Sequence, residues 1–302
     1  MSPTPLARPA ADRWRCPVCG APHHPRRPLY RLRFASAPLE IYRCGCGIRY
    51  SNHALAGSAP DVYDASYYEH LRYTGDAARD AYVAHLAGFF DEAVRRWGSP
   101  AGSRRLLDVG CATGDFVAWA GQSGWDAEGL DVSAAAVSTG RARGLRLRIG
   151  GVDDLAQQGA AYDAITLWDV LEHLSDPTGA LRAISAALRP GGLFLLKTVS
   201  CRSIVDALAS AAYRASGGLA QGALRRMYVP GHLYYYTPKA LARHLAENGW
   251  EVILARQADT PPQALFRSRA LRAAFTVVAA VQAWTGRCYE LFAACRKAGQ
   301  SG

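Results

Sequence analysis

Apolar and polar residues follow two kinds of pattern along the chain, one with helical periodicity and one in which strand and helix patterns alternate. From residue 76 to 97 the apolar positions recur every three or four residues, which predicts an amphipathic helix. Short apolar runs then alternate with helical patterns, so that strands are expected at 105–109, 127–131, 145–149, 162–168 and 193–198, and helices at 115–122, 133–143 and 176–188. Repeated strand–helix units of this length favour an α/β fold, a parallel doubly wound sheet with helices on both faces.

This alternation breaks between residues 200 and 236. The segment holds a helical, small-residue stretch at 203–215, a Gly-rich turn and the run Met227-Tyr-Val-Pro-Gly-His-Leu-Tyr-Tyr-Tyr236. Thr237 and Pro238 then indicate a helix start, since Thr caps free amides and Pro suits the first turn. A strand at 250–255, a helix near 267–284 and a last strand at 289–295 follow. We interpret 200–236 as a cap inserted in the α/β domain.

Composition narrows the class of protein. A chain of 302 residues can bury a core without disulfides. With 50% hydrophobic and 20% charged residues it is not a disordered chain. The longest apolar stretch, 273–286, is shorter than the about 20 residues that a membrane-spanning helix needs. Residues 1–15 contain Pro and Arg without an apolar core, so no secretory signal is expected and the predicted location is cytoplasmic.

The net charge of +10 leaves two interpretations open. Basic side chains can attract phosphate on a nucleic acid, a nucleotide-linked substrate or an anionic membrane surface. The alternative is the codon usage of a GC-rich genome, which raises Arg and Ala together. Almost all the basic residues are Arg, and they are scattered in singles and short pairs rather than in a long run.

Four of the eight cysteines fall within the first 46 residues. They form two close pairs, Cys16 with Cys19 and Cys44 with Cys46. In a cytosolic protein such pairs bind metal more often than they form disulfides. Two pairs on tight turns can close a tetrahedral zinc site, and with four thiolates the zinc would be structural.

The second cysteine pair departs from the usual C-x-x-C spacing. It reads Cys-Gly-Cys, so one ligand could instead come from His23, His24 or His53. Four buried free thiols are the alternative to a metal site.

The turn after the first predicted strand carries the sharpest chemical signal. It reads Leu-Leu-Asp108-Val-Gly110-Cys-Ala-Thr-Gly114, and ligands of open α/β sheets bind at the carboxyl ends of the strands. The turn is not G-x-G-x-x-G and no Lys-Ser/Thr follows, so a phosphate cradle is disfavoured. Asp108 would attract an ammonium group, and Asp131, at the end of the second strand, can accept hydrogen bonds from ribose hydroxyls. Together they suit S-adenosylmethionine; a generic tight turn and a helix cap at Asp131 are the alternatives.

Four segments in order resemble the class I S-adenosylmethionine-dependent methyltransferases, in particular the group similar to ubiquinone-biosynthesis O-methyltransferases. They are residues 106–116, 129–133, 162–177 and 188–194. The resemblance covers about residues 76–297. It implies a Rossmann-like seven-stranded sheet of order 3-2-1-4-5-7-6, with the seventh strand antiparallel.

The same resemblance implies a set of cofactor-binding residues. Asp108 and Gly110 would flank the methionine part of the cofactor, and Asp131 would bind the ribose. The adenine would lie beside Val152 and Asp153. Trp168, at the end of the fourth strand, would lie beneath the cofactor. The full set is Asp108, Gly110, Gly114, Asp131, Val132, Val152, Asp153 and Trp168. Two positions depart from the family pattern: Ala112 replaces a Gly that many relatives have, and Gly151 replaces an acidic residue that meets the adenine in some.

Two histidines are candidates for a general base toward a hydroxyl acceptor. His173 lies in the Leu-Glu-His run after the fourth strand, and His232 lies in the Pro-Gly-His run of the cap. In the family both positions are expected on the carboxyl side of the sheet. The alternatives are a backbone-bonding residue at a helix start for His173 and a loop-ordering residue for His232.

The N-terminal segment also resembles a known extension. Cysteine pairs followed by Cys-Gly-Ile-Arg-Tyr-Ser-Asn and Tyr-Asp-Ala-Ser-Tyr-Tyr are similar to the zinc ribbon of methyltransferases found with sugar and polysaccharide biosynthesis. We therefore predict a zinc-ribbon domain at 1–56, a connector and helix at 57–100, and a methyltransferase domain at 101–302.

The hypothesis from the sequence is methyl transfer from S-adenosylmethionine to a small molecule, at a hydroxyl of a sugar or a related, sugar- or lipid-linked intermediate. One rival is an RNA methyltransferase that binds RNA through the zinc ribbon, although Trp-Asp-Val-Leu-Glu-His replaces the Asn/Asp-Pro-Pro-aromatic run typical of nucleobase amino-methylation. A non-catalytic cofactor-binding scaffold is the other.

The helix expected at 265–284 has two interpretations of its own. Arg267, Arg269 and Arg272 stand at one end of a strongly apolar remainder. Such a helix can lie on a membrane surface and so give peripheral membrane contact. More often it covers the edge of a sheet.

Overall fold

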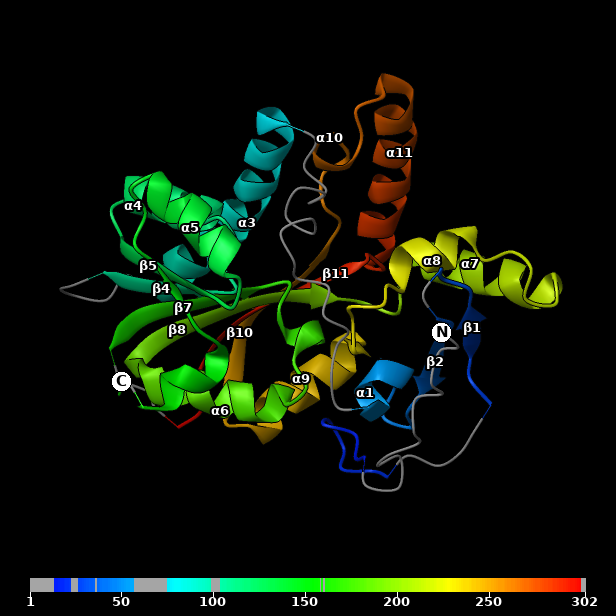
Figure 1. The fold of residues 1–302 in the computed structure, drawn as a ribbon, viewed down its shortest axis with the longest axis horizontal. Helices are drawn as coiled ribbons and strands as arrows, with labels where there is room; N and C mark the ends of the chain where they lie inside the picture. The colour runs from blue at the N-terminus through cyan, green and yellow to red at the C-terminus, as the bar shows by residue number, and fades with distance from the viewer. Residues whose placement is uncertain are drawn as a thin grey trace, which may run out of the picture.

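A computed structural model describes residues 14–22, 27–35, 37–56, 75–98, 104–157, 159 and 161–299. In this part of the chain the larger sheet has seven strands in the order β10-β11-β8-β7-β4-β5-β6 (Figure 1). The strands are β4 (Arg105–Val109), β5 (Asp126–Asp131), β6 (Leu147–Ile149), β7 (Tyr162–Trp168), β8 (Leu188–Val199), β10 (Trp250–Ala258) and β11 (Glu290–Lys297).

The predicted strand order is confirmed. Numbered along the chain, the seven strands read 3-2-1-4-5-7-6 from β6 to β10. The central pairs are parallel, whereas β11 is antiparallel to both β8 and β10. The sheet therefore has its carboxyl ends together at one edge, apart from the reversed β11.

Helices cover both faces of this sheet (Figure 1). Leu106 of β4 packs in one apolar cluster, and its neighbour Leu107 packs in another, because adjacent side chains of a strand point to opposite faces. The first cluster includes residues from α3 (Asp76–Trp97), α4 (Asp115–Gln122) and α5 (Ala134–Ala142). The second includes residues from η1 (Val152–Gln157), α6 (Pro177–Ala187) and α9 (Pro238–Glu247).

A smaller sheet joins the N-terminal segment to the cap. It has the order β1-β2-β3-β9, with β1 (Tyr30–Leu32), β2 (Leu39–Arg43), β3 (Arg49–Ser51) and β9 (Tyr234–Tyr235), and α1 (Asn52–Ala56) follows β3. Because β9 comes from the predicted cap at 200–236, the two segments share backbone hydrogen bonds. The chain between residues 57 and 74, where a Tyr-rich connector is expected, lies outside the described residues.

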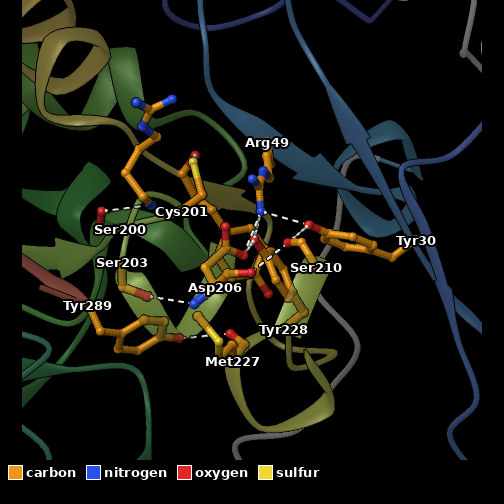
Figure 2. A network of polar contacts seen from close by, with 12 residues as sticks. Tyr30, Arg49, Ser200, Cys201, Ser203, Asp206, Ser210, Met227, Tyr228 and Tyr289 are labelled. Carbon is orange, nitrogen blue, oxygen red and sulfur yellow. Dashed lines mark hydrogen bonds and ion pairs between the residues drawn. The ribbon is translucent and has the colours of Figure 1, made fainter. Parts of the chain in front are cut away.

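A buried ion pair strengthens this junction (Figure 2). Arg49 of β3 donates to Asp206 of α7 (Ile204–Ala215) at 2.6 Å, and their side chains are 14% and 4% exposed. The Tyr228 hydroxyl, just after α8 (Gly222–Met227), also bonds both side chains. Removing one partner of a buried pair leaves an uncompensated charge, which costs about 3–5 kcal/mol. The cap is therefore held on the N-terminal sheet by more than apolar contact.

The structure differs from two expectations about the elements. The strand expected from residue 193 begins at Leu188, because Leu188 pairs with Tyr162, and the Arg-Pro-Gly-Gly segment forms an irregularity within β8 where Gly191 has a φ of 72°. The last helix covers little of the sheet edge: α10 (Pro262–Leu265) is followed by α11 (Arg269–Thr285), which contacts the edge strand β10 but buries only Gln282.

Candidate functional site

A cavity of about 710 Å³ lies at the carboxyl ends of β4, β5, β7 and β8. This size is typical of a site for one small ligand or a cofactor with its substrate. The structure brings most of the predicted site residues to its wall: Asp108, Gly110, Asp131, Val132, Val152, Asp153, Trp168, His173 and His232. Gly114 does not line the cavity; its φ of 82° caps α4 while it packs against Leu145 and Leu147.

The turn after β4 is held close to the end of β5. The amide of Gly110 donates to the carbonyl of Leu130 at 2.7 Å, and its φ is 73°. A Cβ at Gly110 would lie 2.3 Å from Cγ2 of Val170, so no larger residue fits. Ala112 also has a positive φ, 48°, which accounts for the Gly that many relatives are expected to have there.

Asp131 lies buried at the end of β5. One carboxylate oxygen accepts from the amide of Ala112 and the other from the amide of Ser133, each at 2.8 Å. The cap of α5 is Ser133, whose side chain accepts from Ala136, so Asp131 is not the helix cap. A carboxylate is also the acceptor type that a ligand's hydroxyl groups need, because its oxygens only accept hydrogen bonds.

Asp108 is the second buried carboxyl of the cavity, 3% exposed. Burial raises the pKa of Asp108 to about 7, the nearby Asp131 adds to the rise, and a hydrogen bond from Thr166 at 2.7 Å opposes it. A cation beside Asp108 would reverse the effect of burial. The cavity therefore offers a place for positive charge next to a ribose-type site.

The region assigned to the adenine is more open. Val132 is 62% exposed, and a Cβ at Gly151 would meet only Val132, at 3.8 Å. Asp154 is engaged by the amide of Gly151, whereas Asp153 lines the cavity. Gly151 stands where some relatives are expected to have an acidic residue, and the neighbouring Asp153 is an acidic side chain that lines the cavity. Trp168 contributes a buried Nε1 that has no hydrogen-bond partner.

The two candidate histidines lie together. Their rings meet edge to face with centroids 4.6 Å apart. Nδ1 of His173 is 2.8 Å from the carbonyl oxygen of Gly231. Because a carbonyl only accepts, Nδ1 carries the proton and the basic nitrogen of neutral His173 is Nε2. This geometry suits a general base.

Glu172 extends this pair into a cluster of three. It lies beside His173 in η2 (Leu171–His173), is fully buried and accepts from Thr198 at 2.8 Å, while its Oε1 has no hydrogen-bond partner. Glu172, His173 and His232 offer ligand atoms within 4.8 Å of one another, a spacing that also suits a cation. Burial raises the pKa of Glu172 to about 8, and the charge of Asp169 adds to the rise.

The loop that carries His232 is tied to the N-terminal segment. Ser51 donates its amide to the carbonyl of Leu233 at 3.0 Å, and Leu233 donates to the carbonyl of Glu172 at 2.7 Å. Nδ1 of His53 bonds the carbonyl of Pro230 at 2.7 Å. One wall of the cavity therefore depends on β3 and α1.

A buried charge cluster forms the floor of the cavity, and the sequence analysis missed it. Lys197 of β8 is 3.0 Å from Glu290 and 2.8 Å from Asp169. Burial by itself would raise the pKa of Glu290, but Lys197 and His85 outweigh it and lower that pKa to about 2. A signal was present for two of these residues: Lys197 lies within β8 and Glu290 begins β11, two largely apolar strands in which an unpaired charge would be costly.

The four N-terminal cysteines meet in space, as the spacing predicts. Sγ of Cys16 is 3.6 Å from Sγ of Cys46, and Sγ of Cys19 is 3.5 Å from Sγ of Cys44. All four sulfurs lie within 4.8 Å of one another. Tetrahedral zinc with Zn–S bonds of about 2.3 Å needs sulfurs about 3.8 Å apart, so the cluster fits this metal. His53 bonds Pro230 instead, and His23 and His24 lie outside the described residues.

Known proteins resemble the chain over the same region. A family model described as a methyltransferase domain matches residues 82–255. The ubiquinone biosynthesis O-methyltransferase of Xanthomonas axonopodis pv. citri is 35% identical over 117 residues, 36% of this chain and 48% of that protein. That of Bordetella avium is 35% identical over 104 residues, 32% and 43% of the two chains. The chain thus spans about half the length of the curated relatives it matches.

Solved structures resemble the fold. An S-adenosylmethionine-dependent methyltransferase from Archaeoglobus fulgidus superposes with a TM-score of 0.52 at 13% identity, over 78% of this chain and 100% of that one. At this identity the likeness concerns the fold alone. None of the helices in the described ranges is long and apolar enough to cross a membrane.

Proposed function

Because the chain belongs to the methyltransferase domain family, we propose that it transfers a methyl group from S-adenosylmethionine to a hydroxyl of a small-molecule acceptor. The observation that carries the proposal is that one cavity is lined by two buried carboxyls, Asp108 and Asp131, and by His173, whose basic nitrogen is Nε2. The acceptor class we propose is a sugar or a related biosynthetic intermediate.

Three residues would hold the cofactor. Asp131 accepts the ribose hydroxyls on oxygens that the amides of Ala112 and Ser133 already orient. Asp108 faces the cationic amino-acid tail, and Gly110 lets the backbone lie against it. When bound, S-adenosylmethionine supplies an electrophilic methyl on its sulfonium.

His173 would serve the acceptor. Its Nε2 would take the hydroxyl proton as the acceptor oxygen bonds the methyl carbon, and the bond from that carbon to sulfur would break with S-adenosylhomocysteine as the leaving group. The bond from Nδ1 to Gly231 keeps the ring oriented. His232 packs against that ring and shapes the wall. The buried Lys197–Glu290 pair makes the floor of the cavity charged rather than apolar. These features favour a polar acceptor over an apolar one, and O-methylation is what the names of the curated relatives state for those proteins.

We further propose that Cys16, Cys19, Cys44 and Cys46 hold one structural Zn²⁺. The metal would close the N-terminal segment around β3, and through Ser51 and His53 it would support the loop of His232.

Purified protein is expected to contain about one zinc per chain, because four thiolates saturate one tetrahedral ion. Replacing Cys19 by Ala should remove the zinc and lower the unfolding temperature. Elemental analysis of chelator-free preparations measures the first effect and circular dichroism the second. Cys288→Ala, at a cysteine outside the cluster, is the control for zinc content. A Cys19→Ala protein that keeps its zinc would contradict the assignment.

Affinity for S-adenosylmethionine is expected to rise about tenfold from pH 6 to pH 8, since Asp108 with a pKa of about 7 must ionise before it pairs with a cation. Asp108→Asn lacks the titrating carboxyl, so its Kd should not show this change. The ratio of the variant's Kd to the wild-type Kd should therefore rise from pH 6 to pH 8. Calorimetry at several pH values measures both. Parallel pH profiles would show that Asp108 does not face the cationic tail.

Methyl-labelled S-adenosylmethionine, pure protein and extract of the source cells test the proposed acceptor class. After reaction the extract is divided into RNA, lipid and small-molecule fractions. Label in the small-molecule fraction, or on a sugar-bearing lipid, is the expected result. Label in RNA would replace the proposal by an RNA methyltransferase, and protein that binds the cofactor without labelling any fraction would favour a scaffold.

A further inference from the structure

Helix α11 presents an exposed apolar stripe. Trp284 is 86% exposed, Val277 is 65% exposed and Val281 is 46% exposed. With Ala270 and Ala274 these side chains recur every three or four residues, so they lie along one face of the helix. Figure 1 shows α11 projecting from the α/β domain. The stripe therefore runs the length of a helix that little else in the described chain covers.

The opposite side of α11 fixes its rotation. Phe275 stacks on Phe266 with ring centroids 4.2 Å apart. Gln282 donates to Asp259 at 2.8 Å and accepts from the amide of Val205. Because these contacts hold the inner side, the stripe cannot turn inward without breaking them.

The charges around the stripe have one sign. Residues 260–289 contain four arginines and no acidic residue. Arg267, Arg269 and Arg272 stand near the start of the helix and Arg287 just after its end, and all four are exposed. Arg272 also donates to the carbonyl of Phe266 at 2.7 Å, on the side of the helix away from the stripe. A surface that matches this segment is apolar beneath and negatively charged at its border.

From this stripe and its arginines we propose that α11 docks in the plane of an anionic lipid surface. Its 17 residues extend about 25 Å, too short to cross a bilayer but suited to lie on one. Apolar side chains enter the headgroup boundary while arginines meet anionic headgroups, and Trp is enriched at that depth. This docking does not depend on the proposed function.

A second copy of the chain fits the stripe less well. Two such helices would bring arginines to both sides of the contact without an acidic partner on either segment. Leu271 (47% exposed) and Val278 (36% exposed) widen the apolar face, but one face of a 17-residue helix is still smaller than the about 800 Å² per partner of a standard interface.

Docking has a consequence for the cavity. Thr260 and Leu265 line it, and α11 begins four residues after Leu265. A docked α11 would keep this wall of the cavity near the lipid surface, within reach of a lipid-linked acceptor. This consequence, unlike the docking, rests on the proposed function.

Sedimentation with vesicles tests the proposal. The full chain is mixed with vesicles of phosphatidylcholine alone or of phosphatidylcholine and phosphatidylglycerol in equal parts. The triple variant Val277→Ser/Val281→Ser/Trp284→Ser keeps every charge, so it separates helix docking from general adsorption of a basic protein. Ile149→Ser is the control: Ile149 is 56% exposed on β6, at the other edge of the sheet.

The wild type and Ile149→Ser are expected to bind the anionic vesicles, and the triple variant to bind at least about tenfold more weakly, because apolar burial drives insertion. Arg269→Gln/Arg272→Gln should weaken binding to the anionic vesicles with the stripe intact. Circular dichroism checks that each variant is folded. Equal vesicle binding by the wild type and the triple variant would overturn the proposal. Absence of vesicle binding by the wild type would also overturn it. If, in addition, the wild type dimerised in solution and the triple variant did not, the stripe would be a contact between two copies of the chain instead.

Discussion

Replacing His173 by Asn is expected to lower kcat by about 10²–10⁴-fold and to leave the affinity for S-adenosylmethionine unchanged, because only the general base is lost. Asn can keep the bond to the carbonyl of Gly231 through its amide, in place of Nδ1. It has no basic nitrogen to stand in for Nε2. Single-turnover rates with the labelled acceptor and calorimetry with the cofactor measure the two effects.

His53→Asn is the matched control for that variant. His53 also bonds a carbonyl of the same loop, that of Pro230, but it does not line the cavity. Its variant should keep kcat within about threefold, while His232→Asn should lose less than His173→Asn because His232 only packs on the base. If His173→Asn retains more than a tenth of wild-type kcat, His173 is not the base.

Replacing Asp131 by Ala should weaken binding of S-adenosylmethionine at least about 100-fold. Two charge-assisted hydrogen bonds to the ribose are worth about 1.5–3 kcal/mol each, and 1.4 kcal/mol is a tenfold change in Kd. Calorimetry with wild-type and variant protein measures the loss.

Asp131 also orients the turn through the amides of Ala112 and Ser133, so stability has to be measured beside affinity. Asp131→Asn keeps an oxygen for one of those amides and should still lose most of the affinity. Asp126→Ala, at the other end of β5, should bind normally, since Asp126 pairs with the exposed Arg146. Normal binding by a folded Asp131→Ala protein would exclude Asp131 from the ribose site.

The meeting of Asp108, Gly110 and Asp131 at one cavity was predictable because its information is local. Asp108 and Gly110 stand in one strand and turn, and Asp131 ends the neighbouring parallel strand, so both sets reach the same edge of the sheet. The cysteine cluster followed from spacing for the same reason: each pair lies on one tight turn. In both cases a few consecutive residues carry most of the geometry.

The charged floor of the cavity and the pairing of the cap with the N-terminal sheet were not predictable, because both depend on register between distant segments. Lys197 and Glu290 meet through the antiparallel pairing of β8 and β11, two apolar strands whose pattern does not specify alignment. β9 has two residues, too few for any periodicity, yet it joins the cap to β3. Likewise the apolar pattern of α11 could not decide between its two interpretations, since the same pattern is typical of a buried helix and of one that lies on a surface.

A crystal structure of the protein with S-adenosylhomocysteine tests the central claim most directly. The account predicts one molecule per chain in the cavity, with ribose hydroxyls on Asp131, the amino-acid tail beside Asp108 and Gly110, and the sulfur facing His173. Binding elsewhere, or with the sulfur turned away from His173, would contradict the assignment of this cavity as the site of methyl transfer.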